Sequence, residues 1–174
     1  MRPTVRASRL RHPSVNTTTP FASISSDLAA RALHLATAQP VRAWFTPKSR
    51  SAKRIEVTDD FEVWLLGWLP GQGTDLHDHG GLSTPSPAGF AVAQGELTQY
   101  TVQPGEPPRL RSETVPAGTA ATVDVTAVHA VVNHTDVPAV SVHVYAPRLA
   151  IMRRYLFDES GLWLSSMVRA GGSW

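Results

Sequence analysis

Two histidines, His77 and His79, occur one residue apart in the segment HDHGG. Alternate side chains of an extended chain point to the same side, so both imidazoles can face one point while Asp78 faces away. Neutral imidazole is the commonest side-chain ligand of metal ions in proteins. The spacing therefore predicts a pair of metal ligands on a strand, although two surface histidines in a glycine-rich loop would give the same pattern.

A second histidine-bearing segment, VHAVVNHTDVPAVSVHVYAP, begins at Val128. A catalytic metal typically needs three protein ligands and an open position, and this segment offers the third ligand. His129 is the candidate. His134 is the rival, but it lies in His-Thr-Asp-Val-Pro, which is a turn composition, and we expect it outside the ligand set.

Ser141, His143 and Tyr145 alternate with valines in the same segment, within AVSVHVY. On a strand the three polar side chains share one face and the valines share the other. A solvent-facing row usually contains Lys or Glu, which this row lacks. We therefore predict a buried network in which His143 connects Ser141 to Tyr145 and orients the phenol.

The chain has 174 residues, 42% of them hydrophobic, which suits a single domain with one core. It contains no cysteine, so a metal would be bound through nitrogen and oxygen. No apolar run approaches the length of a membrane span and no secretory signal is recognisable. We therefore expect a cytoplasmic protein with no membrane partner, and the oligomeric state is left open, with a monomer as one alternative.

Residues 1–22 carry four arginines and no acidic residue, at Arg2, Arg6, Arg9 and Arg11. These four account for the basic excess of the chain, because sixteen basic residues face fourteen acidic ones in all. The composition predicts a disordered, dispensable tail before one domain at residues 23–174, with a transit peptide as the alternative. Aromatic residues are not interleaved with the arginines, so we expect no nucleic-acid partner.

One helix and then a series of short strands should position the histidines. The segment SSDLAARALHLATAQ from Ser25 starts with serines and an aspartate, has apolar residues at helical spacing and ends before Pro40. Beyond about residue 53, short β-rich runs alternate with Gly and Pro, which predicts a mainly β fold, an antiparallel sandwich or barrel. The C-terminal run MRRYLFDESGLWLSSMVRAGGSW suggests two strands around Gly161, and we expect them over the barrel rather than at the metal.

A small β-barrel with inward-facing histidines resembles a cupin. Parts of the two cupin motifs are matched at Gly71, His77 and His79 and at Pro116-Ala117-Gly118, His129 and Asn133. The resemblance implies a cupin-type antiparallel β-barrel or jelly roll after the N-terminal helical segment. The glutamate of the first motif is missing, because Ser83 and Thr84 stand in its place. Three neutral ligands would leave the metal's charge unneutralised, which favours direct binding of an anionic substrate.

Two blocks narrow the resemblance. FEVWLLGWLPGQGTDLHDHGG and VHAVVNHTDVPAVSVHVYAP are similar to the cysteine dioxygenase family of thiol dioxygenases, over about residues 54–147. The resemblance implies one mononuclear iron(II) ion bound by His77, His79 and His129. It also implies that Ser141, His143 and Tyr145 form the family's catalytic triad outside the ligand set.

The resemblance further implies that Arg54 binds the substrate carboxylate, with Tyr145 beside the substrate; Arg50 and Lys53 are close alternatives to Arg54. The cysteine that some relatives crosslink to the tyrosine is absent, and Ala88 or Gly89 lies near its position.

The implied reaction adds O2 to a small thiol, L-cysteine in the first instance, and gives the sulfinate. The expected partners are therefore a small-molecule thiol and O2. Three alternatives remain: a 3-mercaptopropionate dioxygenase on the same scaffold, a cupin using another metal for other chemistry, and a metal-free cupin that serves as a binding module.

Overall fold

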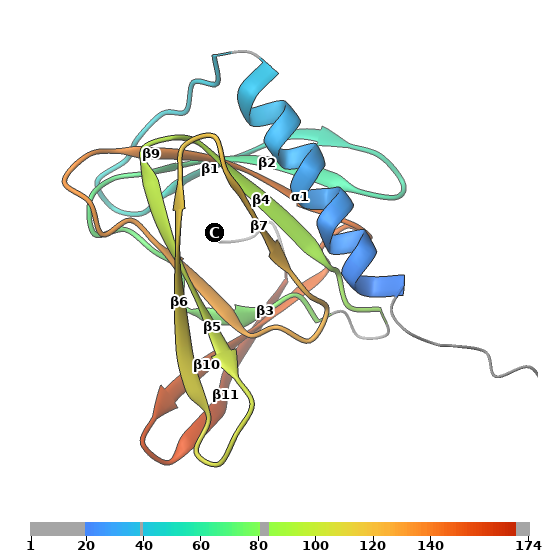
Figure 1. Cartoon of the computed structure of the whole chain (residues 1–174), viewed down its shortest axis with the longest axis vertical. Coiled ribbons are helices and arrows are strands. Elements are labelled where there is room, and N and C mark those ends of the chain that lie inside the picture. The colour runs from blue at the N-terminus through green and yellow to red at the C-terminus, as the bar shows by residue number, and fades with distance from the viewer. Residues whose placement is uncertain (1–19, 39, 81–83, 170–174) are drawn as a thin grey trace, which may run out of the picture.

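The computed structural model describes residues 20–38, 40–80 and 84–169. Within these ranges one helix precedes eleven strands, which form two antiparallel sheets that face each other (Figure 1). The mainly β fold with one N-terminal helix is thus confirmed. The arginine-rich tail lies outside the described residues, except that residues 20–22 already belong to the helix.

The first sheet has five strands and is covered on its outer face by the helix, α1 (Pro20–Ala38). Its order is β1 (Ser51–Val57), β2 (Glu62–Trp68), β9 (Ala139–Tyr145), β4 (Ala88–Gln94) and β7 (Ala120–Val123). α1 starts five residues before the predicted Ser25, at a proline, which is favoured in a first helical turn because its missing N–H would have no partner there.

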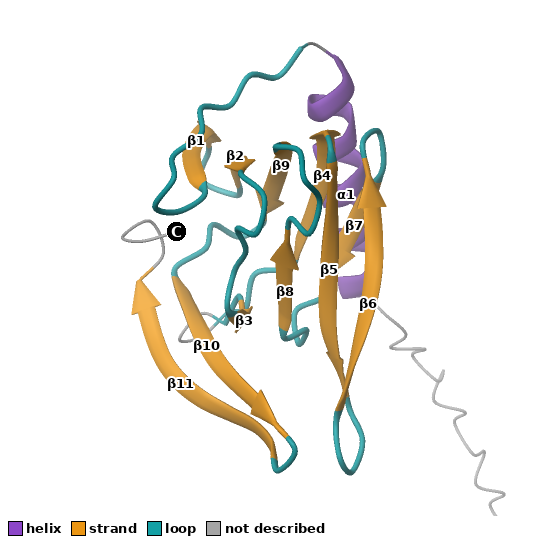
Figure 2. Ribbon diagram, turned by 90° about the vertical axis from the view of Figure 1, so that its left-hand side faces the viewer, coloured by secondary structure: helices purple, strands orange, loops and turns teal. Residues whose placement is uncertain are grey.

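The second sheet has six strands and carries the histidine pair. Its order is β11 (Gly161–Arg169), β10 (Ile151–Asp158), β3 (Leu76–Asp78), β8 (His129–Val132), β5 (Glu96–Gln103) and β6 (Arg109–Pro116). Figure 2 shows β3 as a very short strand between the long β10–β11 hairpin and β8. His77 of β3 lies directly opposite His129 of β8 in this sheet.

β2 is buried on both faces of the first sheet, which explains why its sequence is a nearly continuous apolar run. Val63 and Leu65 pack under Leu28 and Ala32 of α1, whereas the alternate residues of β2 belong to the core between the two sheets. α1 lies close to β4, because a Cβ added at Gly89 would come within 2.2 Å of the Ala29 backbone nitrogen. Burying a leucine such as Leu28 in this layer stabilises the fold by about 1.5–3 kcal/mol.

The polar row of β9 faces the interior. Val140, Val142 and Val144 pack with α1, so Ser141 and His143 project from the opposite face, between the sheets. Every residue of β9 is buried. The valines therefore pack β9 against the helix. The polar side chains that alternate with them face the core, as the sequence predicts.

The C-terminal strands differ from their predicted position. β10 and β11 are present, but β10 also pairs with β3 and places Arg154 opposite His77. The expectation that this segment lies away from the histidine pair was wrong. Without β10, one edge of β3 beside the histidines would present unpaired backbone N–H and C=O groups. β10 supplies the hydrogen-bonding partners for this edge. No helix in the described ranges has the length and apolar character to span a membrane.

Candidate metal centre

Three buried histidines meet between the sheets. His77 comes from β3, His79 from the residue after it and His129 from β8, and each offers a ring nitrogen within 4.8 Å of the others. The Nε2 atoms of His79 and His129 are 3.2 Å apart. Metal–nitrogen distances of about 2.1 Å place adjacent ligand atoms roughly 3.0–3.4 Å apart, so this pair has the separation of two ligands of one ion.

The protonation of the three imidazoles suits metal binding. His77 Nδ1 is 2.9 Å from the Asp75 carbonyl oxygen, which can only accept, so Nδ1 carries the hydrogen and Nε2 keeps its lone pair. Burial lowers the pKa of His77 to about 4. Burial, and then the neighbouring histidines, lower the pKa values of His79 and His129 well below the usual value. All three are neutral at pH 7 and available as ligands.

Asp78 lies between the two histidines in sequence but is not part of this group. Its carboxylate accepts hydrogen bonds from Arg153 Nε, at 3.1 and 3.0 Å, from the Tyr155 hydroxyl at 2.7 Å and from the Gly80 N–H at 3.0 Å. Burial alone would raise the pKa of Asp78, but the hydrogen bonds from Arg153 and Tyr155 hold it below its usual value. The group of possible ligands in the described chain is therefore three imidazoles without a carboxylate, which fits one divalent ion.

The polar row lies beside the histidines. The rings of Tyr145 and His79 meet edge to face with centroids 5.0 Å apart. Ser141 Oγ and His143 Nε2 are 2.8 Å apart, and burial lowers the pKa of His143 to about 3, so this imidazole is neutral. Burial also raises the pKa of Tyr145, which keeps its phenol protonated at pH 7.

Trp68 extends this row and was missed by the sequence analysis. Its indole Nε1–H donates to Ser141 Oγ at 2.9 Å, and its side chain is fully buried. The available signal was the alternation of β2, which puts Trp68 on the same inward face as Trp64. Ala88 lies directly opposite Tyr145 in the sheet.

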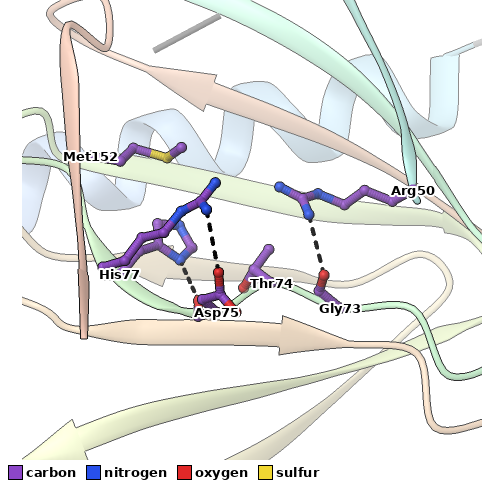
Figure 3. Close-up of a pocket in the computed structure, with 7 residues that line it drawn as sticks. Arg50, Gly73, Thr74, Asp75, His77 and Met152 are labelled. Carbon is purple, nitrogen blue, oxygen red and sulfur yellow. Dashed lines mark hydrogen bonds and ion pairs between the residues drawn. The ribbon is translucent and has the colours of Figure 1, made fainter. Parts of the chain in front are cut away.

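A cavity of about 120 Å³ opens beside His77. Figure 3 shows Arg50 extending over it towards the side on which His77 lies. Arg50 donates from Nη1 to the Gly73 carbonyl at 3.2 Å, its guanidinium lies 5.5 Å from the Trp68 ring centroid, and its buried Nε has no hydrogen-bond partner among the described residues. Burial lowers the pKa of Arg50, as expected for a cation held in a partly dry site.

The structure does not bring Arg54 to this cavity. Arg54 Nη1 lies 3.4 Å from Glu62 Oε2, and half of the Arg54 side chain is exposed. Glu62 is buried and also accepts from the Leu149 N–H at 3.1 Å, so Arg54 compensates a buried carboxylate at the edge of the sheet. Lys53 is exposed. The carboxylate anchor that the sequence analysis assigned to Arg54 thus has a better placed alternative in Arg50.

The remaining candidate, His134, lies on the surface, where its Nε2 is 2.9 Å from the Tyr100 hydroxyl. It lies apart from the three-histidine group, as the turn composition around it predicts. Ser83 and Thr84 stand where cupins carry a glutamate. Ser83 lies outside the described residues, so the structure describes only Thr84 of these two positions.

A comparison with protein families identifies the family of the chain. The family model described as cysteine dioxygenase type I matches residues 32–160. A comparison with curated proteins gave no match.

Several solved structures share the fold. TT1209 from Thermus thermophilus is 24% identical, with 61% of this chain and 90% of that chain covered and a TM-score of 0.52. An uncharacterized conserved protein with a double-stranded beta-helix domain from Klebsiella pneumoniae is 21% identical, with 72% and 90% covered and a TM-score of 0.51. Oxalate decarboxylase from Bacillus subtilis is 16% identical, with 65% and 29% covered and a TM-score of 0.53. These likenesses support the cupin-like double-stranded β-helix and nothing finer.

Proposed function

The chain belongs to the cysteine dioxygenase type I family, and from this premise we propose that it is a non-haem iron(II) thiol dioxygenase. Its substrate would be a small thiol that carries a carboxylate, and its product the corresponding sulfinate. Family membership and the buried three-histidine group already indicate a metal-dependent cupin dioxygenase. What the proposal adds is the identity of the metal, iron(II), and the chemical class of the substrate, a small thiol.

The observation that carries the proposal is a group of three neutral imidazoles, one of which, His77, lines the same cavity as the partly buried Arg50. Without a carboxylate ligand, a divalent ion keeps its full charge and favours a thiolate as a ligand. Arg50 offers a planar guanidinium with a buried, unpartnered Nε, which matches the geometry of a carboxylate. The site is thus complementary to a molecule with both a thiolate and a carboxylate.

The chain's own residues would have distinct tasks in this reaction. His77, His79 and His129 would hold the ion, which when bound lowers the pKa of the thiol and brings thiol and O2 together. Arg50 would fix the carboxylate end of the substrate. Tyr145, still protonated, would donate a hydrogen bond near His79, and Ser141 and His143 would keep the phenol in place.

The reaction balances without a further reductant. The thiol and O2 give the sulfinate and one proton, so sulfur loses four electrons, O2 gains four, and both oxygen atoms end on sulfur. No nicotinamide or flavin is needed. L-cysteine and 3-mercaptopropionate both meet these requirements, and they differ in the amine that cysteine adds.

The test is anaerobic loading with iron(II), followed by oxygen uptake and sulfinate detection with L-cysteine and 3-mercaptopropionate. We expect one iron per chain and one O2 consumed per sulfinate formed. His79→Ala should lose both metal and activity, whereas His134→Ala, an exposed histidine removed in the same way, should retain both.

Other outcomes would identify the rivals. Tight, stoichiometric binding of manganese or nickel in protein that oxidises no thiol would favour a cupin with other chemistry. A protein that binds no metal, and in which His79→Ala changes nothing, would be a binding module. The cytoplasmic location stays a prediction from the sequence.

A further inference from the structure

A second cavity, of about 190 Å³, lies against the β5–β6 hairpin, which Figure 2 shows as two long paired strands. Among the described residues it shares none with the cavity beside His77, and β8 lies between β3 and β5 in the sheet. About 10–15 Å³ is enough to hold one water molecule, so this cavity has room for a small organic molecule. Its polar lining includes Gln99, Thr101, Arg111, Glu113, Thr122 and Asp124.

Side-chain alternation directs Gln99 and two charged residues of β6 to the inner face of the hairpin. Leu97 and Val115 lie opposite each other and belong to the core between the sheets. Two residues further along the strands, Gln99 lies opposite Glu113, and Arg111 follows Glu113 on the same face. The face that is apolar in the core thus becomes polar towards the hairpin turn, where the cavity lies.

Gln99 has a buried amide that is only partly satisfied. The residue is 5% exposed, and its Nε2 donates to the Thr122 carbonyl oxygen at 3.3 Å and to Thr101 Oγ1 at 3.4 Å. A carbonyl oxygen only accepts, so the amide nitrogen must face it, and this fixes the orientation of the amide. Gln99 Oε1 is then a buried acceptor with no hydrogen-bond partner among the described residues. A buried acceptor at a cavity marks a place for a donor group of a ligand.

The charged residues of the cavity do not neutralise one another. Arg111, Glu113 and Asp124 are exposed, and within the described ranges none of their side chains forms an ion pair. Arg111 and Glu113 are two residues apart on β6, roughly 7 Å along the strand, so one small molecule can contact both. With Gln99 Oε1, the cavity offers an amide oxygen and two carboxylates as acceptors and one guanidinium as donor.

We infer that this cavity binds a small zwitterionic amino acid, at a site separate from the metal centre. The ammonium group of the ligand donates to Gln99 Oε1 and pairs with Glu113, and its carboxylate accepts from Arg111. Asp124 adds negative charge that favours the ammonium group. The burial of Gln99 strengthens the contact at the floor, whereas the exposed charges contribute less each. Binding involves no covalent step and does not depend on the chemistry at the metal centre.

An NMR titration of nitrogen-15-labelled full-length protein with L-alanine tests the site. L-alanine has no thiol, so the proposed reaction does not consume it. We expect saturable binding with a Kd of about 1 mM or below. The amide shifts should be concentrated on β5 and β6, at residues 96–103 and 109–116. Shifts concentrated at Arg50 and His77 instead, or no binding of L-alanine, would overturn the inference.

Analogues and exposed variants test the two charges separately. Propionate lacks the ammonium group and ethylamine lacks the carboxylate, and each should bind about tenfold or more weakly than L-alanine. Glu113→Gln and Arg111→Gln should each weaken the binding of L-alanine by about threefold to tenfold. Arg148→Gln, which removes an exposed arginine outside the cavity, should bind L-alanine as the wild type does.

Gln99→Leu separates a built site from a general attraction to exposed charges. It removes the buried oxygen and should abolish the binding of L-alanine, with thermal unfolding as the check that the variant is folded. Wild-type binding in folded Gln99→Leu would contradict the inference. If Gln99→Leu folds poorly, the two exposed variants decide, because equal affinity in both and in the wild type would also contradict it. Oxygen uptake with thiols tests the proposed function independently of all these results.

Discussion

Trp68 determines the direction of the hydrogen bonds along the polar row. The indole N–H is only a donor, so Ser141 Oγ accepts from it. Ser141 is fully buried and has His143 as its other partner, so its hydroxyl hydrogen is donated to His143 Nε2. The neutral His143 ring must then carry its own hydrogen on Nδ1. One buried indole thereby fixes the tautomer of the histidine that precedes Tyr145.

Removing the serine hydroxyl should disturb this arrangement without affecting the metal ligands. In Ser141→Ala the Trp68 N–H and His143 Nε2 both lose their partner, at a cost of about 1–3 kcal/mol in stability. We expect kcat to fall about tenfold, with little change in KM or in bound iron. Kinetics and metal analysis on the same preparation check this.

Ser112→Ala, an exposed serine on β6, is the matched control and should behave as wild type. A Ser141→Ala enzyme with normal kcat would show that the hydrogen bonds of Ser141 do not contribute to catalysis. Trp68→Phe should shift kcat in the same direction as Ser141→Ala, because it removes the same donor.

Site residues could be predicted from the sequence where all of them lie on one extended segment. The alternation of side chains along such a segment identifies His77 and His79 as one group and Ser141, His143 and Tyr145 as another. Arg50 and Arg54 could not be separated in this way, because the segment that contains both is a basic run in which position along the chain does not show which side chain turns inward. The folded structure distinguishes the two arginines, because Arg54 pairs with Glu62 at the edge of the sheet.

Among the elements, β3 depends most on its neighbours. It has three residues, too few to fix two metal ligands by its own pairing, and it pairs with β8 through the single register pair His77–His129. β10 supplies the support: Arg153 and Tyr155 bind Asp78, and the Arg153 guanidinium lies so close to Gly80 that a Cβ there would come within 2.6 Å of it. Asp78 thus holds the histidine pair from the face opposite the metal.

Asp78→Asn should therefore weaken metal binding although Asp78 is not a ligand. The amide loses the charge-assisted bonds to Arg153 and leaves β3 less firmly held. We expect iron affinity to fall about tenfold to a hundredfold, the range seen for residues that orient metal ligands. Competition with a chelator of known affinity measures this.

Asp60→Asn, which changes an exposed aspartate in the turn before β2, should keep the wild-type affinity. Tyr155→Phe removes one of the hydrogen bonds to Asp78 and should give a smaller loss in the same direction. An unchanged iron affinity in Asp78→Asn would show that the contacts of Asp78 with β10 are not needed to position His77 and His79.

The whole fold was predictable in class but not in pairing. The short β-rich runs after residue 53 and the frequent Gly and Pro residues between them indicate an antiparallel β sandwich or barrel, and local patterns place α1 and most strands. Which strand lies beside β3 depends on contacts between segments far apart in the chain, and no local pattern encodes them. Arg154, which also lines the cavity beside His77, was missed for this reason, because only the β10–β3 pairing places it opposite His77.

The burial of neutral histidines between two sheets gives the whole molecule a pH dependence. An unfolded histidine has a pKa near 6.5, whereas burial lowers the pKa of His77 to about 4 and that of His143 to about 3. Below about pH 6.5 the unfolded chain therefore binds protons that the native protein does not. Stability is fully present above pH 6.5 and is lost as the pH falls towards these lowered values.

For metal-free protein, His77 alone corresponds to a loss of about 3 kcal/mol between pH 6.5 and about 4. Urea unfolding of chelator-treated protein at several pH values in this window should show the free energy of unfolding falling steadily. Iron should add stability near pH 7, and its contribution should disappear on acidification, because protonated imidazoles cannot bind the ion. A free energy of unfolding that stays constant over the window would mean that the histidines take up protons as readily in the folded protein as in the unfolded chain, so that burial does not lower their pKa values.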